Sequence, residues 1–145
     1  AYADVSDVVP AVNQFEISPL NTQKKLIKFC QDKGVVVTAM STFSHFRSNE
    51  PRKEIVDNPI IKNIAEKYGK STFQVVLRWL VQQDITVIPK TWDSAHLKEN
   101  IDIDSFSLTQ EEMSAIDSMD QGKFLNYNPC PWVRKMPEKY RNIQY

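Results

Sequence analysis

The stretch ITVIPKTWDSAHLKEN, residues 85–100, decides the fold. It opens with a run of β-branched residues that stops at Pro89, and a lysine and a threonine follow. Asp93 then stands where its side chain can cap an amphipathic helix. A short apolar run that leads directly into a helix is typical of a parallel β/α unit. The stretch therefore places Lys90 where a strand gives way to a helix.

The rest of the chain repeats this alternation of strand and helix. Besides the run ITVIP (85–89), two apolar runs predict strands, VVPAVNQF (8–15) and VVVTA (35–39). Because none of the three alternates apolar with polar residues, we expect strands covered on both faces. Helical spacing of apolar residues predicts helices over 22–33, 60–68 and 72–83, the last capped by Ser71, and another beginning at Thr109. The order predicts parallel β/α units.

Three strands form an incomplete sheet, because both of its edges lack a neighbour. We therefore expect further strands beside them. The sequence has only three glycines, Gly34, Gly69 and Gly122, and each follows a predicted helix that it would end in a left-handed conformation. No glycine is left for a GxGxxG or GxxxxGK phosphate loop, so those nucleotide-binding motifs are absent.

The composition argues against several classes of protein. The 145 residues carry 18 basic and 18 acidic side chains, so nonspecific electrostatic binding to nucleic acid or to a charged membrane surface is not expected. No apolar run approaches the roughly 20 residues that span a bilayer. The two cysteines, Cys30 and Cys130, are far apart and are read as reduced thiols of a cytoplasmic protein. With two histidines and no metal-ligand spacing, no metal site is predicted.

Four segments, in order, resemble the aldo-keto reductase family. They are AVNQFEISP (11–19), VVVTAMS (35–41), VIPKTWDSAHLKEN (87–100) and FSLTQEEMSAIDSMD (106–120). The resemblance implies an α/β fold, a (β/α)8 TIM barrel, and it runs along nearly all of the chain.

By this resemblance, residues 1–145 are the C-terminal half of such a barrel, without an internal domain boundary. They would hold its last three strands, the closing helices (93–120) and the C-terminal loop (122–145). A complete barrel takes about 250 residues. The family's catalytic tyrosine, lysine, aspartate and histidine lie on earlier strands and match nothing here, so no catalytic residue is predicted. A start without methionine favours a fragment.

The family's active face lies at the carboxyl ends of the strands, and the first two strands here offer candidates for contact with NADP(H) or NAD(H). Gln14 matches a glutamine that binds the nicotinamide carboxamide; the alternative is a glutamine that satisfies barrel backbone. Met40 stands where the family usually has a stacked aromatic residue, which implies weaker holding of the ring. Ser41 and Phe43 follow, the serine matching one near the pyrophosphate. The next loop, 42–54, carries cations that either meet phosphates or are simply solvated.

The third strand supplies the adenosine end by the same resemblance. Lys90 and Thr91 match the pocket for the ribose phosphate, although a solvated lysine is the alternative. His96 stands where NADPH-specific relatives carry arginine, and imidazole lacks the permanent bidentate charge of guanidinium. This set of cofactor-binding residues also includes three more: Trp92, Glu99 and Asn100. The indole of Trp92 is otherwise assigned to packing, like that of Trp79.

Trp132 in the tail is the candidate for a wall of the substrate pocket, although a lone aromatic more often packs. In the complete enzyme the substrate would be a small aldehyde or ketone. The partner would be the remaining half of the barrel or a second copy. Two alternatives stay open: a non-catalytic, self-associating half-barrel, and a small nucleotide-binding module.

Overall fold

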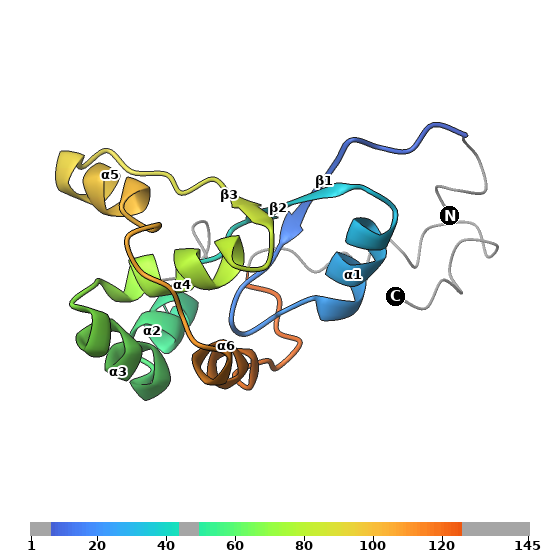
Figure 1. Ribbon diagram of the computed structural model, residues 1–145. Coiled ribbons are helices and arrows are strands. Elements are labelled where there is room, and N and C mark those ends of the chain that lie inside the picture. Colours follow the sequence, from blue (N-terminus) through green and yellow to red (C-terminus); the bar gives the residue numbers. More distant parts are fainter. Residues whose placement is uncertain (1–6, 44–49, 126–145) are drawn as a thin grey trace.

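The computed structural model describes residues 7–43 and 50–125. Strands and helices alternate as the sequence predicts (Figure 1). The elements are β1 (Val12–Glu16), α1 (Lys24–Asp32), β2 (Val36–Met40), α2 (Glu50–Val56), α3 (Pro59–Tyr68), α4 (Thr72–Val81), β3 (Ile85–Val87), α5 (Ser94–Ile101) and α6 (Gln110–Asp117).

The three strands form one parallel sheet in the order β1-β2-β3. Gln14 pairs with Thr38, and Thr38 with Thr86, so these three residues share one face of the sheet. The predicted strands were too long at two ends. Val8 to Ala11 precede β1, and β3 stops at Val87 before Ile88 and Pro89, because proline cannot donate to the ladder.

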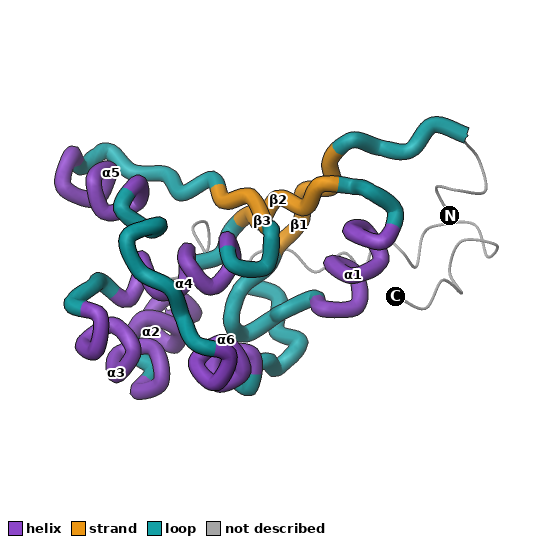
Figure 2. Tube along the Cα trace, in the orientation of Figure 1, coloured by secondary structure: helices purple, strands orange, loops and turns teal. Residues whose placement is uncertain are grey.

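Helices cover only one face of this sheet, so the expectation of two covered faces is wrong within the described residues. Figure 2 shows the helices gathered on one side of the three strands. Ile85 and Val37 on the covered face are 2% and 1% exposed. On the other face Val12 and Val36, which pair with each other, are half exposed. The strands thus contain more apolar residues than the described part of the chain buries.

The core lies between the covered face and helices α1, α3, α4 and α6. Trp79 on α4 is fully buried, which confirms its assignment to packing. Its Nε1 donates to Asp117 Oδ1 at 3.0 Å, and the other oxygen of Asp117 pairs with Lys24 at 2.7 Å. One buried indole therefore links three helices, since these residues lie on α4, α6 and α1.

Local capping signals account for where the helices begin. Ser71 with Gln74 and Thr109 with Glu112 form reciprocal capping boxes, as the sequence predicts. Asp93 accepts hydrogen bonds from the amides at the start of α5 and caps that helix. Gly69 ends α3 at φ 60°. Gly122 is also left-handed, but the expectation that it ends a helix is wrong, because α6 already ends at Asp117 and the glycine lies in the segment beyond.

One helix, α2, was not predicted from the sequence, which treated 42–54 as a loop. Of its side chains, Ile55 is fully buried, but a helix this short gives too little apolar spacing to be detected. The candidates Trp132 and Cys130 lie outside the described residues. Within the described ranges, no helix has the length and apolar character to cross a bilayer, and no three potential metal ligands cluster.

Glu112 generates a test of this packing. Its carboxylate accepts from Lys67 Nζ at 2.6 Å, Tyr68 Oη at 2.8 Å and the Thr109 amide at 2.8 Å. Burial alone would raise the pKa of Glu112, but these hydrogen bonds outweigh it and lower the pKa below its ordinary 4.5. The stabilisation is present above that ordinary value and is lost as the pH falls through the lowered pKa.

We therefore expect Glu112→Gln to lower the free energy of unfolding by about 1–2 kcal/mol at pH 7. The difference from wild type should shrink as the pH falls from 7 to 3. Urea unfolding at both pH values measures it, with Glu66→Gln, on the exposed side of α3, as the control. A difference that stays constant with pH would contradict the assignment.

Candidate functional site

The carboxyl ends of the three strands open onto one cavity of about 400 Å³. Because the strands are parallel, their ends meet at the same edge of the sheet. The residues that line the cavity come from all three strand ends and from the helices that follow: Gln14, Ala39, Met40, Ser41, Thr42, Phe43, Arg52, Phe73, Leu77, Val87, Ile88, Pro89, Lys90, Thr91, His96, Glu99 and Asn100. All but one of the predicted cofactor residues are among them.

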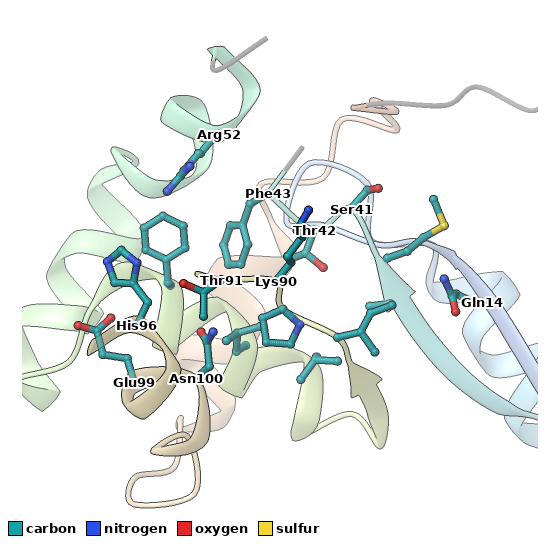
Figure 3. Close-up of a pocket in the computed structure, with 17 residues that line it drawn as sticks. Gln14, Ser41, Thr42, Phe43, Arg52, Lys90, Thr91, His96, Glu99 and Asn100 are labelled. Carbon is teal, nitrogen blue, oxygen red and sulfur yellow. The ribbon is translucent and has the colours of Figure 1, made fainter. Parts of the chain in front are cut away.

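Polar groups from β1 and β2 lie at one end of the cavity. Figure 3 shows Gln14 at one side of the view, with Ser41 at the end of the neighbouring strand. The Gln14 side chain is exposed and Met40 is half-buried. Ser41 adopts a left-handed backbone conformation at φ 56°, which is rare for a residue other than glycine. Strain of this kind concentrates at functional sites, where surrounding structure holds it in place.

Aromatic side chains form the wall between the strand ends and α2. The rings of Phe43 and Phe73 lie 4.8 Å apart at an angle of 57°. The guanidinium carbon of Arg52 lies 4.8 Å from the centre of the Phe73 ring. A cation is attracted to the face of an aromatic ring, so this contact favours a position of the exposed Arg52 side chain beside the cavity, where it could donate to an anion.

Lys90 lies three residues beyond Val87, the last residue of β3, and not directly at the strand end as predicted. Its side chain forms no ion pair with a carboxylate in the described part of the chain. Its Nζ lies 5.0 Å from the ring centre of Trp92. Trp92 itself is 92% exposed and does not line the cavity, so its assignment to packing is wrong for the described residues. Its indole can only support Lys90 from the rim.

The far end of the cavity is built by α5. His96, Glu99 and Asn100 point toward it from this helix (Figure 3). Asp93 fixes the start of α5, because Oδ1 accepts from the amides of Ala95 at 2.7 Å and His96 at 3.3 Å. These backbone hydrogen bonds lower the pKa of Asp93 below its usual value.

Glu99 is oriented by a contact that sequence reasoning missed. Its Oε2 accepts from Ser71 Oγ at 3.1 Å, at the N-terminus of α4. The positive end of a helix favours a carboxylate nearby. Ser71 was detectable as a cap but not as a neighbour of Glu99, since the two are 28 residues apart. Phe73 and Leu77 were likewise read only as core residues of α4.

The arrangement suits an extended anionic ligand with ring systems. Arg52 and Lys90 supply positive charge in its middle, Gln14 offers an amide that both donates and accepts, and aromatic faces lie between them. No tyrosine of the described residues lines the cavity. Tyr68, the only tyrosine in the described ranges, donates to Glu112 on the other side of α4. Trp132 lies outside the described residues.

Comparisons with known proteins agree with this geometry. The model of the aldo/keto reductase family matches residues 3–121. An NAD(P)H-dependent 6'-deoxychalcone synthase from Glycine max is 36% identical over 122 residues, which are 84% of this chain and 38% of that protein. A probable NAD(P)H-dependent D-xylose reductase from Emericella nidulans is 40% identical over 129 residues, 84% of this chain and 40% of the relative.

A solved structure resembles nearly the whole of this chain. A Bombyx mori aldo-keto reductase in complex with NADP superposes with a TM-score of 0.80 and 33% identity, over 97% of this chain and 46% of that one. The chain thus spans about two fifths of the length of the curated relatives that it matches. Its parallel sheet is the corresponding part of an α/β TIM barrel. On the extent of the family match, the chain belongs to the aldo/keto reductase family.

Proposed function

We propose that this chain is the cofactor-binding part of an NAD(P)H-dependent carbonyl reductase. The observation that carries the proposal is that three residues line one cavity: Gln14 within β1, Ser41 directly after β2, and Lys90 in the segment after β3. Two relatives that match more than four fifths of the chain are named as a probable NAD(P)H-dependent D-xylose reductase and an NAD(P)H-dependent pentose reductase, which supports the same chemistry.

The cavity fits a nicotinamide dinucleotide by the chemistry of its donors. Gln14 and Met40 would hold the nicotinamide end, and Ser41 with Arg52 the phosphates. A phosphate at the adenosine end would meet Lys90, whose position beside the N-terminus of α5 also favours an anion. A volume of about 400 Å³ is within the range of roughly 300–1,000 Å³ usual for ligand pockets. Trp92 belongs to this proposal only as a rim residue.

At the adenosine end, Thr91 would contact the ribose phosphate together with Lys90. Glu99 and Asn100 would face the adenine edge, and Phe43 would pack along the dinucleotide. When bound, NAD(P)H supplies the hydride that reduces an aldehyde or ketone. This chain would bind and orient the cofactor, whereas the proton donor would come from strands that the described residues do not include. We place the activity in the cytoplasm, in accord with the free, buried Cys30.

Lys90 gives the first test. We expect Lys90→Met to weaken NADPH binding about tenfold, because a charge-assisted contact with the ribose phosphate is lost. The affinity for NADH should change by less than about threefold, since NADH lacks that phosphate. Titration of the chain with each dinucleotide, followed by cofactor fluorescence, gives both affinities.

Lys98, exposed on α5 and outside the cavity, provides the matched control as Lys98→Met. Its affinities should equal those of the wild type. Absence of dinucleotide binding by the wild type, or equal losses for NADPH and NADH in Lys90→Met, would refute the assignment.

His96 gives a second test, of cofactor preference. Guanidinium offers a permanent charge and two parallel donors to a phosphate, which imidazole does not. We therefore expect His96→Arg to raise the preference for NADPH over NADH, on the order of tenfold. The ratio of the two dissociation constants measures it. A wild type that already prefers NADPH as strongly as the variant would show that His96 does not limit selectivity.

A second candidate function is a half-barrel that associates with another copy or with a separate partner half. Exposed apolar side chains favour it, because Leu97 and Ile101 of α5 are 54% and 72% exposed and Val12 at the opposite edge is 53% exposed. Surface of this kind usually marks a contact. The unpaired outer edges of β1 and β3 in the described sheet point the same way.

This candidate predicts concentration-dependent self-association of the 145-residue chain. Sedimentation velocity should show a dimer at tens of micromolar, and Leu97→Glu with Ile101→Glu should shift it toward monomer, because charge opposes apolar burial. Phe29→Glu, on the distant helix α1, tests whether the effect is local to α5. A chain that stays monomeric throughout would remove this candidate.

A further inference from the structure

Residues 120–125, here named the 120–125 segment, are hydrogen-bonded to the loop that follows β1. The amides of Gln121 and Lys123 both donate to the carbonyl of Leu20 at 3.0 Å. Thr22 Oγ1 donates to Asp120 Oδ2 at 2.5 Å. Burial would raise the pKa of Asp120, but the hydrogen bonds from Thr22 and from the Gly122 amide lower it overall. The segment therefore has a fixed place against the end of β1.

A further hydrogen bond joins the segment to β1 itself. The amide of Leu125 donates to the carboxylate of Glu16, the last residue of the strand, which is 4% exposed. Glu16 lies two residues beyond Gln14, so both side chains are on the same face of β1. The segment thus ends beside the strand that carries the amide of the cavity.

From this fixed place the 120–125 segment holds α2. Glu54 Oε1 accepts from Gln121 Nε2 at 3.1 Å, and Glu54 Oε2 pairs with Lys123 Nζ. The hydrogen bond from Lys123 is the main cause of the lowered pKa of Glu54. A carboxylate with two partners on one segment is restrained in position as well as in charge.

The other side of α2 faces the cavity. Arg52 and Glu54 are two residues apart, which places them about 200° apart around the helix. Arg52 lies over Phe73 and lines the cavity, and Figure 3 shows it directed from its helix toward the other lining residues. Ile55, fully buried, supplies the apolar attachment between these two sides. A movement of α2 at Glu54 would therefore displace Arg52.

We propose that Glu54 is a positioning residue for the dinucleotide site: by joining α2 to the 120–125 segment, it sets the place of Arg52 at the cavity. The inference rests on the proposed function, since the ligand that Arg52 would meet is the phosphate part of the dinucleotide. Glu54 itself does not line the cavity. Its effect on binding passes through Arg52.

The test uses charge reversal in the 145-residue chain, with NADPH as the probe. Glu54→Lys and Lys123→Glu should each weaken NADPH binding about fivefold, because like charges then face each other across the contact. The double variant restores an opposite pair and should bind within about twofold of the wild type. Lys62→Glu breaks the Asp57–Lys62 pair, 2.8 Å long and just beyond α2, and should leave binding unchanged.

A further cycle shows whether the effect passes through Arg52. In an Arg52→Gln background, Glu54→Lys should cause little additional loss, since the group that it displaces is gone. Thermal unfolding of every variant separates positioning from stability: the midpoint of Glu54→Lys should match that of the Lys62→Glu control.

The outcomes are distinct. Two results would overturn the positioning role alone. One is that the wild type binds NADPH and both single reversals keep the same affinity, and the other is that the double variant does not recover the affinity. Full additivity of Glu54→Lys with Arg52→Gln would also overturn it. A wild-type chain that binds no NADPH would overturn the proposed function, and the role of Glu54 with it.

Discussion

The parallel pairing of β1, β2 and β3 is the constraint on which the site depends. Gln14 and Lys90 are far apart in sequence, yet parallel hydrogen bonding brings the carboxyl ends of their strands to one edge. An antiparallel arrangement would send one of these ends to the opposite side of the sheet. The left-handed turn at Ser41 belongs to the same constraint, because the chain leaves β2 at the cavity and must turn there at a cost of about 1 kcal/mol or more.

The bare face of the sheet explains why the strand sequences are more apolar than the described chain needs. In a closed barrel, the face that helices do not cover points to the interior and is filled by side chains from the other strands. Val12 and Val36 on this face pair with each other and are half exposed. Their exposure agrees with the extent of the match, since this chain covers only about two fifths of each relative and the strands that would fill the interior are not among the described residues.

The sequence predicted those features that have a local physical signal. The order of elements follows from apolar periodicity, and the starts of α4, α5 and α6 follow from Ser71, Asp93 and Thr109, whose side chains cap within three residues. Features that depend on distant contacts were not predictable in this way. The helix α2 has little periodicity of its own, and the exposure of Trp92 reflects the absence of any described element against it. The cofactor residues came from family resemblance, not from pattern.

The lining of the cavity is held from the covered side of the sheet, which is why it can keep its shape while the other face stays bare. Phe73 projects from α4, whose following residues Val75 and Val76 are fully buried in the core. Glu99 takes its orientation from Ser71 at the start of the same helix. Helix α5 has no buried residue, and polar contacts hold both of its ends. Asp93 caps its start, and Glu99 accepts from Ser71. Asp102 at its C-terminus pairs with Lys70 and accepts from Gln74 of α4. The packed helix α4 is thus the support through which core stability reaches the end of the cavity formed by α5.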